Sequence, residues 1–147
     1  MLLHASCVAI NGKAVLLTGI SGVGKSDLAI RLIDDGAQLV ADDQTLLSIE
    51  NGVLLASPPP TIEGMIEIRH AGLARLPFVA GVPVALLVDL TPSGQVLERM
   101  PEQNVIFFLD QPVQRLRLPA FAASTPAKIR LLLSHPGIND GTTNKLH

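Results

Sequence analysis

Short apolar runs separated by turn residues fill most of the chain, and their lengths are typical of β-strands. Asn11-Gly12 separates two such runs, Cys7–Ile10 and Ala14–Leu17, and this dipeptide favours the type I′ turn of a β-hairpin. Glu50-Asn51-Gly52 predicts a second hairpin for the same reason. The other predicted strands are Leu39–Ala41, Leu46–Ile49, Val53–Ala56, Val84–Leu90 and Val105–Leu109.

Helical periodicity marks two further segments. The first, Asp27–Asp35, is followed by Gly36, which is a suitable C-cap because glycine tolerates a left-handed backbone. The second, Pro126–His135, directs Lys128 and Arg130 to solvent. The predicted inward-facing residues are Leu28, Ala29, Leu32 and Ile33 in the first helix and Ile129, Leu132 and Leu133 in the second.

The remaining segments have weaker patterns. Pro58-Pro59-Pro60 forces an extended loop, and Thr61–Arg69 permits a helical turn that leads into an extended Glu67-Ile68-Arg69. Residues 137–147 are polar, and we expect this tail to fray. Because strands outnumber helices and hairpins accompany one strand–loop–helix unit, the sequence predicts an α/β fold with a mixed sheet, formed as one domain by residues 1–136.

The composition narrows the function classes. Of the 147 residues, 48% are hydrophobic and 16% are charged, with no Trp or Tyr, so we expect an aliphatic core and apolar surface for subunit contacts. A formal net charge of −2 lacks the basic signature of nucleic-acid binding. The single cysteine, Cys7, excludes an internal disulfide and fits a reducing cytoplasm. The longest apolar stretch, Leu76–Leu90, contains prolines and Asp89 and is too short for a membrane span, and Met1–Ile10 lacks the charged start of a signal peptide.

Residues 19–26 fit the phosphate-binding P-loop pattern G-x-x-x-x-G-K-[ST]. Such a loop points backbone N–H groups at phosphate oxygens, Lys25 can reach the β- and γ-phosphates, and Ser26 can hold Mg²⁺. The strand-like run Ala14–Thr18 and the helix predicted after the loop supply the required context. We expect Lys25 to be exposed to ligand and to contribute little to the core. The predicted phosphate-binding residues are Gly19, Ile20, Ser21, Gly22, Val23, Gly24, Lys25 and Ser26.

Chemistry at a γ-phosphate also needs carboxylates, and three apolar runs end in Asp. Asp42-Asp43 has the strongest claim, because it follows Lys25 by one helix and one strand and should lie near the P-loop strand. Two adjacent acids also suit divided roles, one toward a proton and one toward metal or an arginine. Asp89 and Asp110 are each followed closely by proline, and both are interpreted as turn residues.

Other charged residues have both a structural and a functional interpretation. Glu67 and Arg69 lie two apart on an extended segment and should share a face, either as an exposed ion pair or as a metal ligand beside a phosphate-binding cation. His4 between apolar residues is by itself most simply structural, and Arg99 by itself a solvated loop charge.

The order and spacing of these elements resemble HPr(Ser) kinase/phosphorylase, in the short form that lacks the N-terminal domain of longer members. The resemblance implies a P-loop fold related to phosphoenolpyruvate carboxykinase and a hexameric assembly. It also implies that ATP and Mg²⁺ are used to phosphorylate a serine of HPr, the small carrier of the sugar phosphotransferase system, and that inorganic phosphate removes this group to give pyrophosphate. The elements that carry the resemblance are His4, Gly19–Ser26, Ala41-Asp42-Asp43, Pro58-Pro59 with Glu67-Ile68-Arg69, and Arg99 after Thr91-Pro92.

Carried over by position, the resemblance implies that Lys25 contacts phosphate and that Ser26 and Glu67 bind Mg²⁺. It implies that one of Asp42 and Asp43 is the general base, a role that a serine acceptor requires. The remaining implied active-site groups are His4, Arg69 and Arg99.

Two segments depart from the family pattern. His70–Arg75 replaces a Gly-Leu-Gly segment, and Leu118–Ser124 replaces a Pro-Val-x-Pro-Gly-Arg-like segment tied to dephosphorylation. The residues implied for the kinase reaction are all present. The two departures therefore concern the phosphorylase reaction and the surface that would contact the partner, and both of these stay open. The alternatives are a P-loop kinase of a small metabolite, which usually needs an arginine-rich lid, and a nucleotide-sensing module without an acceptor. The C-terminal half offers such a lid only Arg115, Arg117, Lys128 and Arg130.

Overall fold

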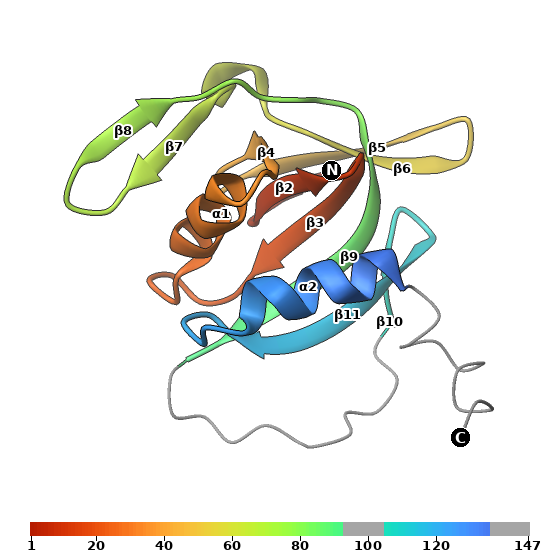
Figure 1. Ribbon diagram of the computed structural model, residues 1–147. Coiled ribbons are helices and arrows are strands. Elements are labelled where there is room, and N and C mark those ends of the chain that lie inside the picture. The colour runs from red at the N-terminus through yellow and green to blue at the C-terminus, as the bar shows by residue number, and fades with distance from the viewer. Residues whose placement is uncertain (93–104, 136–147) are drawn as a thin grey trace, which may run out of the picture.

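The computed structural model describes residues 1–92 and 105–135 of the chain (Figure 1). The predicted tail, 137–147, lies outside these residues. Helix α1 spans Lys25–Asp34, helix α2 spans Thr125–Ser134, and a single 3₁₀ turn covers Pro60–Ile62. The strands are β1 (Leu2–Leu3), β2 (Ser6–Ile10), β3 (Lys13–Thr18), β4 (Gln38–Ala41), β5 (Thr45–Glu50), β6 (Val53–Ser57), β7 (Met65–Ile68), β8 (Gly72–Arg75), β9 (Val82–Thr91), β10 (Val105–Phe108) and β11 (Gln111–Pro119).

The main sheet is mixed, as predicted, and has the strand order β1-β5-β6-β9-β3-β2-β4. The long strand β9 pairs in parallel with β3 on one side and with β11 on the other, and β10 pairs with β11. β7 and β8 form a separate hairpin that projects beside α1 (Figure 1). The middle parts of the central strands, residues 14–17 of β3 and residues 86–88 of β9, are continuous apolar runs because both of their faces are covered.

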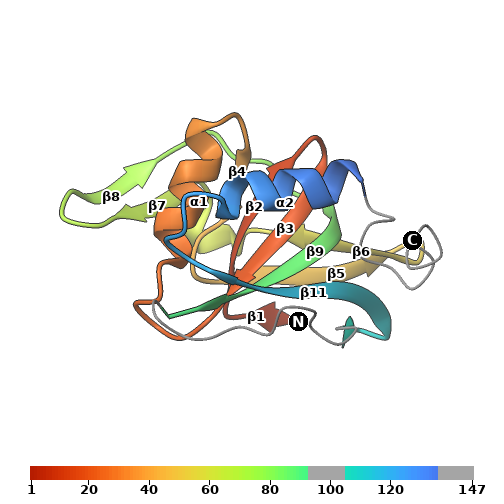
Figure 2. The ribbon, with the colours of Figure 1, turned by 60° about the horizontal axis from the view of Figure 1, so that its bottom comes forward.

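Each face of the sheet has its own hydrophobic core. Both helices lie on one side (Figure 2), where Leu28 and Leu32 of α1 and Ile129 of α2 pack on Val15 and Val88 of the sheet. On the opposite side, Leu16 and Leu87 pack with residues of β5, β6, β10 and β11. Cys7 belongs to this second core, where burial raises the pKa of its thiol, so it is a neutral packing residue and not a nucleophile.

The predicted hairpin turns are confirmed. Asn11 and Gly12 have φ of 51° and 76°, and Asn51 and Gly52 have 53° and 77°, which are the paired positive values of a type I′ turn. The helix predicted at Asp27–Asp35 begins two residues earlier, at Lys25. At its end the N–H of Gly36 donates to Ile33 and that of Ala37 to Leu32, the Schellman pattern for which glycine is suited.

Three strands were not predicted, namely β1, β8 and β11, and the last two affect the site. β11 contains Pro112 and charged residues, yet its alternation of Arg115 and Arg117 with Leu116 and Leu118 is a strand signal. β8 lies in the half-exposed β7–β8 hairpin. Its four residues therefore give almost none of the apolar alternation that marks a strand with one buried face. Within the described part of the chain, no helix is long and apolar enough to cross a membrane.

Candidate active site

The loops that carry the predicted site gather at one edge of the sheet. β9 and β11 run parallel to β3, and β4 shares this direction because β2 is antiparallel to both β3 and β4. The carboxyl ends of these four strands therefore lie at one edge, where open α/β sheets bind ligands. The P-loop follows β3, Asp42-Asp43 follow β4, and the segment 120–124 follows β11 (Figure 1).

The P-loop turns tightly against its neighbours and leads directly into α1. Gly19 has a φ of 146°, and a Cβ there would lie 2.8 Å from Val23 Cγ1 and 3.0 Å from the Leu90 carbonyl oxygen. Gly24 has a φ of 114° and is the residue before the first turn of α1. The unpaired N–H groups of that first turn face the loop, so the fold aims the positive end of the helix dipole at the phosphate position.

Lys25 bridges the loop from the base of α1. Its Nζ donates hydrogen bonds to the carbonyl oxygens of Gly19, at 2.9 Å, and Ile20, at 3.3 Å. The residue is only 8% exposed to solvent, so it is more buried than the sequence suggested. It still lines the cleft described below, and its exposure to ligand stays a prediction. The ammonium group folds back over the loop because the carbonyl groups of the loop are its nearest acceptors. This position places the positive charge where the phosphate oxygens of a ligand would compete with those carbonyl groups for its hydrogen bonds.

Asp42 is the buried centre of the site. Its Oδ1 accepts hydrogen bonds from Ser6 Oγ at 2.9 Å and Ser26 Oγ at 2.7 Å, and its Oδ2 accepts one from the Glu67 N–H at 2.9 Å. One carboxylate therefore connects β2, the P-loop end of α1 and β7. β4 is not beside the P-loop strand, since β2 lies between them, but Asp42 reaches across to Ser26.

Asp43 differs from its neighbour in exposure and partner. Its φ of 67° turns the chain at the end of β4, and its N–H donates to Ser6 Oγ at 3.1 Å. Its Oδ1 lies 3.3 Å from His4 Nε2, and the two side chains are 63% and 61% exposed. The exposed carboxylate beside an imidazole can accept a proton from an incoming hydroxyl, whereas Asp42 already has hydrogen-bond partners on both oxygens.

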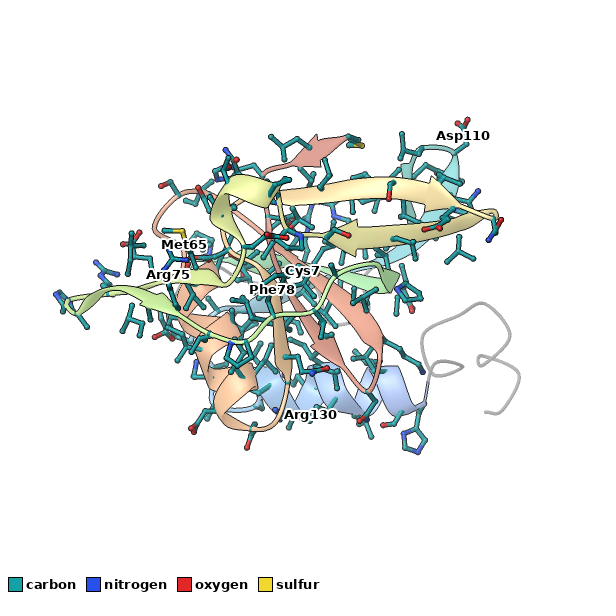
Figure 3. The ribbon with its side chains drawn as sticks, turned by 90° about the horizontal axis from the view of Figure 1, so that it is seen from above. Cys7, Met65, Arg75, Phe78, Asp110 and Arg130 are labelled. Carbon is teal, nitrogen blue, oxygen red and sulfur yellow. The ribbon has the colours of Figure 1, made fainter. Side chains whose placement is uncertain are left out.

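A cleft of about 450 Å³ lies along the P-loop and the start of α1 and reaches Asp43. One wall is formed by Glu67 of β7 and by Arg69, which directly follows this strand. The sequence permitted a helical turn within Thr61–Arg69, but the 3₁₀ turn begins at Pro60, in the segment expected to be extended, and Met65 already belongs to β7. The β7–β8 hairpin, marked by Met65 and Arg75 in Figure 3, lies at the end of the molecule opposite Asp110. The residues that line the cleft are Ser21, Gly22, Gly24, Lys25, Ser26, Asp27, Ile30, Asp43, Glu67, Ile68, Arg69 and Phe121.

Other predicted residues have separate positions. Asp110 has a φ of 64° at the turn between β10 and β11, so its assignment as a turn residue is confirmed. Arg99 lies outside the described residues. Arg115 and Arg117 pair with Asp89, and Arg130 pairs with Asp35 at 2.9 Å across α1 and α2, so these arginines do not gather over the cleft.

Asp89 is not a turn residue, contrary to the sequence interpretation. It lies inside β9, opposite Thr18 of β3 and Arg117 of β11. Its Oδ1 accepts a hydrogen bond from Thr18 Oγ1 at 3.2 Å, and its Oδ2 lies 2.9 Å from Arg115 Nη2. The chain does not turn at Asp89, because β9 continues to Thr91 and pairs there with Pro119 of β11.

We expect Asp89→Asn to lower the free energy of unfolding by about 1.5–3 kcal/mol, because Arg115 loses a charged hydrogen-bond partner that is largely shielded from water. The cleft should keep its shape, since Asp89 is not among the residues that line it. Urea denaturation measures the loss of stability, and an amide NMR spectrum shows whether the residues of the cleft are disturbed. Asp110→Asn, at an exposed turn, is the control, and equal stability of the two variants would contradict the role of the ion pair.

Ser6 is a site residue that sequence reasoning missed. It is fully buried at the start of β2, donates to Asp42 and accepts from the Asp43 N–H, so it fixes both acids. A polar residue immediately before a predicted apolar strand was its only signal, and that signal does not distinguish a site residue from a strand end. Phe121 was also missed, because its loop was considered only as a departure from a family pattern.

Comparisons with known proteins identify the family of this chain. The family model described as HPr Serine kinase C-terminal domain matches residues 1–124. The chain belongs to this family. An HPr kinase/phosphorylase of Geobacillus sp. (strain WCH70) is 35% identical over 127 residues, and that of Bacillus subtilis (strain 168) is 30% identical over 128 residues. These matches cover 79% and 80% of this chain but only 41% of each relative, so the chain matches less than half the length of these curated relatives.

The fold is shared with a solved structure of the family. The Hpr(Ser) kinase/phosphatase from Coxiella burnetii has a TM-score of 0.80 and 30% sequence identity, and the match covers 92% of this chain and 95% of that one. The predicted α/β fold with a mixed sheet is therefore confirmed at the level of the whole domain.

Proposed function

We propose that this chain is an ATP-dependent protein serine kinase that acts on the phosphocarrier HPr. The observation that carries the proposal is the chain of contacts from the P-loop to the two acids: Ser26 Oγ donates to Asp42 at 2.7 Å, and the adjacent Asp43 lies 3.3 Å from His4 Nε2. A nucleotide-binding loop is thus joined to an exposed carboxylate suited to an acceptor hydroxyl. The relatives are named HPr kinase/phosphorylase. We propose that HPr is the substrate of this chain as well.

In the proposed mechanism the P-loop and Lys25 hold the phosphates of ATP and stabilise the charge of the transferring group. Ser26 and Glu67 are the proposed ligands of Mg²⁺, which typically takes one or two carboxylates together with substrate phosphates. Bound Mg²⁺ would supply neutralising charge at the phosphates. Arg69 and Arg99 are the proposed further cations, and Arg69 lines the cleft beside Glu67.

Asp43 is the proposed general base. It accepts the proton of the HPr serine hydroxyl as the serine oxygen attacks the γ-phosphorus and the bond to ADP breaks. His4 orients this carboxylate, and Asp42 holds Ser26 and the Glu67 backbone in place. In the reverse direction, with inorganic phosphate as acceptor, the same carboxyl group would return the proton to the serine and pyrophosphate would leave.

The direct test is label transfer from γ-³²P-ATP to purified HPr. Label on the serine of HPr supports the proposal, label on a small metabolite supports a metabolite kinase, and nucleotide binding without transfer supports a sensing module. Incubation of labelled phospho-HPr with inorganic phosphate then tests the phosphorylase reaction through formation of pyrophosphate.

We expect Ser26→Ala to raise the Mg²⁺ concentration required for half-maximal activity by about 10-fold, since losing a ligand-shell group typically weakens metal binding by about 10–100-fold. The rate at saturating Mg²⁺ should fall less. A Mg²⁺ titration at fixed ATP measures the shift, with Ser48→Ala on the exposed face of β5 as the control. An unchanged Mg²⁺ dependence would remove Ser26 from the proposed metal site.

The proposal includes assembly of the chain into a cytoplasmic hexamer whose partner is HPr. It also includes that this hexamer binds neither nucleic acid nor a membrane. The apolar segment Leu76–Val84 gives this assembly little support as an exposed surface, because Val82 is buried and Leu76 and Val79 pack against the two cores. Light scattering should give six times the 15.5 kDa mass of one chain. A fully active species of 15.5 kDa would refute an obligatory oligomer.

A further inference from the structure

The loop after β11 places an aromatic side chain in the nucleotide cleft. Phe121 lines the cleft together with the P-loop residues, and 51% of the residue is exposed. The Arg31 guanidinium carbon lies over its ring, 5.9 Å from the centroid. The ring edge abuts the P-loop, since a Cβ built on Gly24 would lie 2.8 Å from Phe121 Cζ. One face of the ring is thus covered by a cation while much of the side chain remains open.

The loop that carries Phe121 is fixed on both sides. Arg31 donates a hydrogen bond to the Ala120 carbonyl oxygen and also pairs with Asp27 at 3.1 Å. Thr125, at the start of α2, donates from Oγ1 to the Pro119 carbonyl oxygen at 2.6 Å. A ring held in this way loses little conformational freedom when a flat ligand group packs on it.

The order of the strands determines which side of the P-loop faces the nucleoside. Asp43 follows β4, two strands from β3 on one side, and Phe121 comes after β11, two strands from β3 on the other side. In phosphoryl transfer the attacking and leaving oxygens lie roughly in line across the γ-phosphorus. If the acceptor hydroxyl approaches beside Asp43, the leaving ADP and its nucleoside extend toward the β11 side.

We propose that Phe121 is the stacking surface for the base of the bound nucleoside triphosphate. This inference rests on the proposed function, because the direction of the nucleoside follows from Asp43 as the base. Stacking of a base on an aromatic side chain strengthens binding and is tolerant of base identity. The Arg31 guanidinium on the ring adds a fixed positive charge beside the base.

The test compares ligands with and without a base. ATP and inorganic tripolyphosphate are titrated by calorimetry, with Mg²⁺ present, into the wild type, Phe121→Leu and the control Phe107→Ala. Leucine keeps apolar cover over Gly24 but removes the aromatic face, and Phe107 is a 65% exposed phenylalanine on β10. We expect Phe121→Leu to weaken ATP binding about 10-fold and to leave tripolyphosphate binding unchanged. Equal weakening of both ligands, or of neither, would overturn the proposal.

A second variant gives an independent signal. The chain has no Trp or Tyr, so Phe121→Trp carries a single indole reporter. Quenching of its emission by ATP but not by tripolyphosphate is expected, and equal responses to the two ligands would contradict base stacking. Transfer to HPr by the wild type is measured in parallel. Base-dependent binding without transfer to HPr would contradict the proposed kinase function and support the stacking role of Phe121. Transfer to HPr without base-dependent binding would support the kinase function and contradict the stacking role.

Discussion

Lys25→Ala should lose nearly all phosphoryl transfer from ATP to HPr, with kcat/KM lower by at least about 10²–10³-fold, the usual effect of removing one preorganised charge-stabilising donor. The Lys25 ammonium lies between the Gly19 and Ile20 carbonyl groups, so it is positioned before the nucleotide arrives. No other described cation occupies the interior of the P-loop. Steady-state transfer kinetics with purified HPr measure the loss.

The control for this experiment must separate catalysis from folding, because Lys25 is buried. Lys25→Met retains most of the apolar stem, and Lys128→Ala removes an exposed lysine from α2. We expect circular dichroism spectra like that of the wild type for all three variants and loss of transfer only for the two at position 25. Wild-type turnover by a folded Lys25→Ala protein would show that the P-loop is not the catalytic phosphate site.

The elements closest to the P-loop were predictable because local signals determine them. Paired Asn-Gly turns, a glycine C-cap after Asp35 and the P-loop pattern each act over a few residues, and the structure has all of them where the sequence places them. The amphipathic helix near the C-terminus was predicted within one residue at each end. Its Ile129 and Leu133 are buried as expected, whereas Arg130 is held by Asp35 and not simply directed to solvent.

Long-range pairing was the part that local signals could not supply. Asp89 looked like a turn residue because its partners, Thr18 and Arg115, lie far away in the chain. β11 was missed for a related reason, since its strand conformation is stabilised by pairing with β9. The burial of Lys25 and the role of Ser6 likewise depend on atoms that only the folded sheet edge brings together.

Within the candidate site, the sequence identified the acids but not their division of labour. Adjacent residues at a strand end project in different directions, so only the structure distinguishes the buried, fully hydrogen-bonded Asp42 from the exposed Asp43. The change of direction follows from the positive φ of Asp43, a conformation that Asp adopts more readily than most residues. Composition and spacing contain no equivalent information.

Asp43→Asn should lower the rate of transfer to HPr by about 10²–10⁴-fold, the usual loss when a positioned general base is removed. ATP binding should stay within a few fold, and stability should change by less than about 0.5 kcal/mol because the side chain is exposed. Transfer kinetics, calorimetric ATP binding and urea denaturation measure these three quantities.

Asp42→Asn is the matched comparison, and we expect it to act on structure as well as rate. The amide can accept from Ser6 and Ser26 only if its NH₂ group faces the Glu67 N–H, which is itself a donor. The resulting unpaired donors should lower the free energy of unfolding by about 1–3 kcal/mol and raise the Mg²⁺ requirement. If Asp42→Asn is instead stable and inactive while Asp43→Asn keeps wild-type turnover, the base is Asp42, and the exposed pair of His4 and Asp43 is peripheral to the proton transfer.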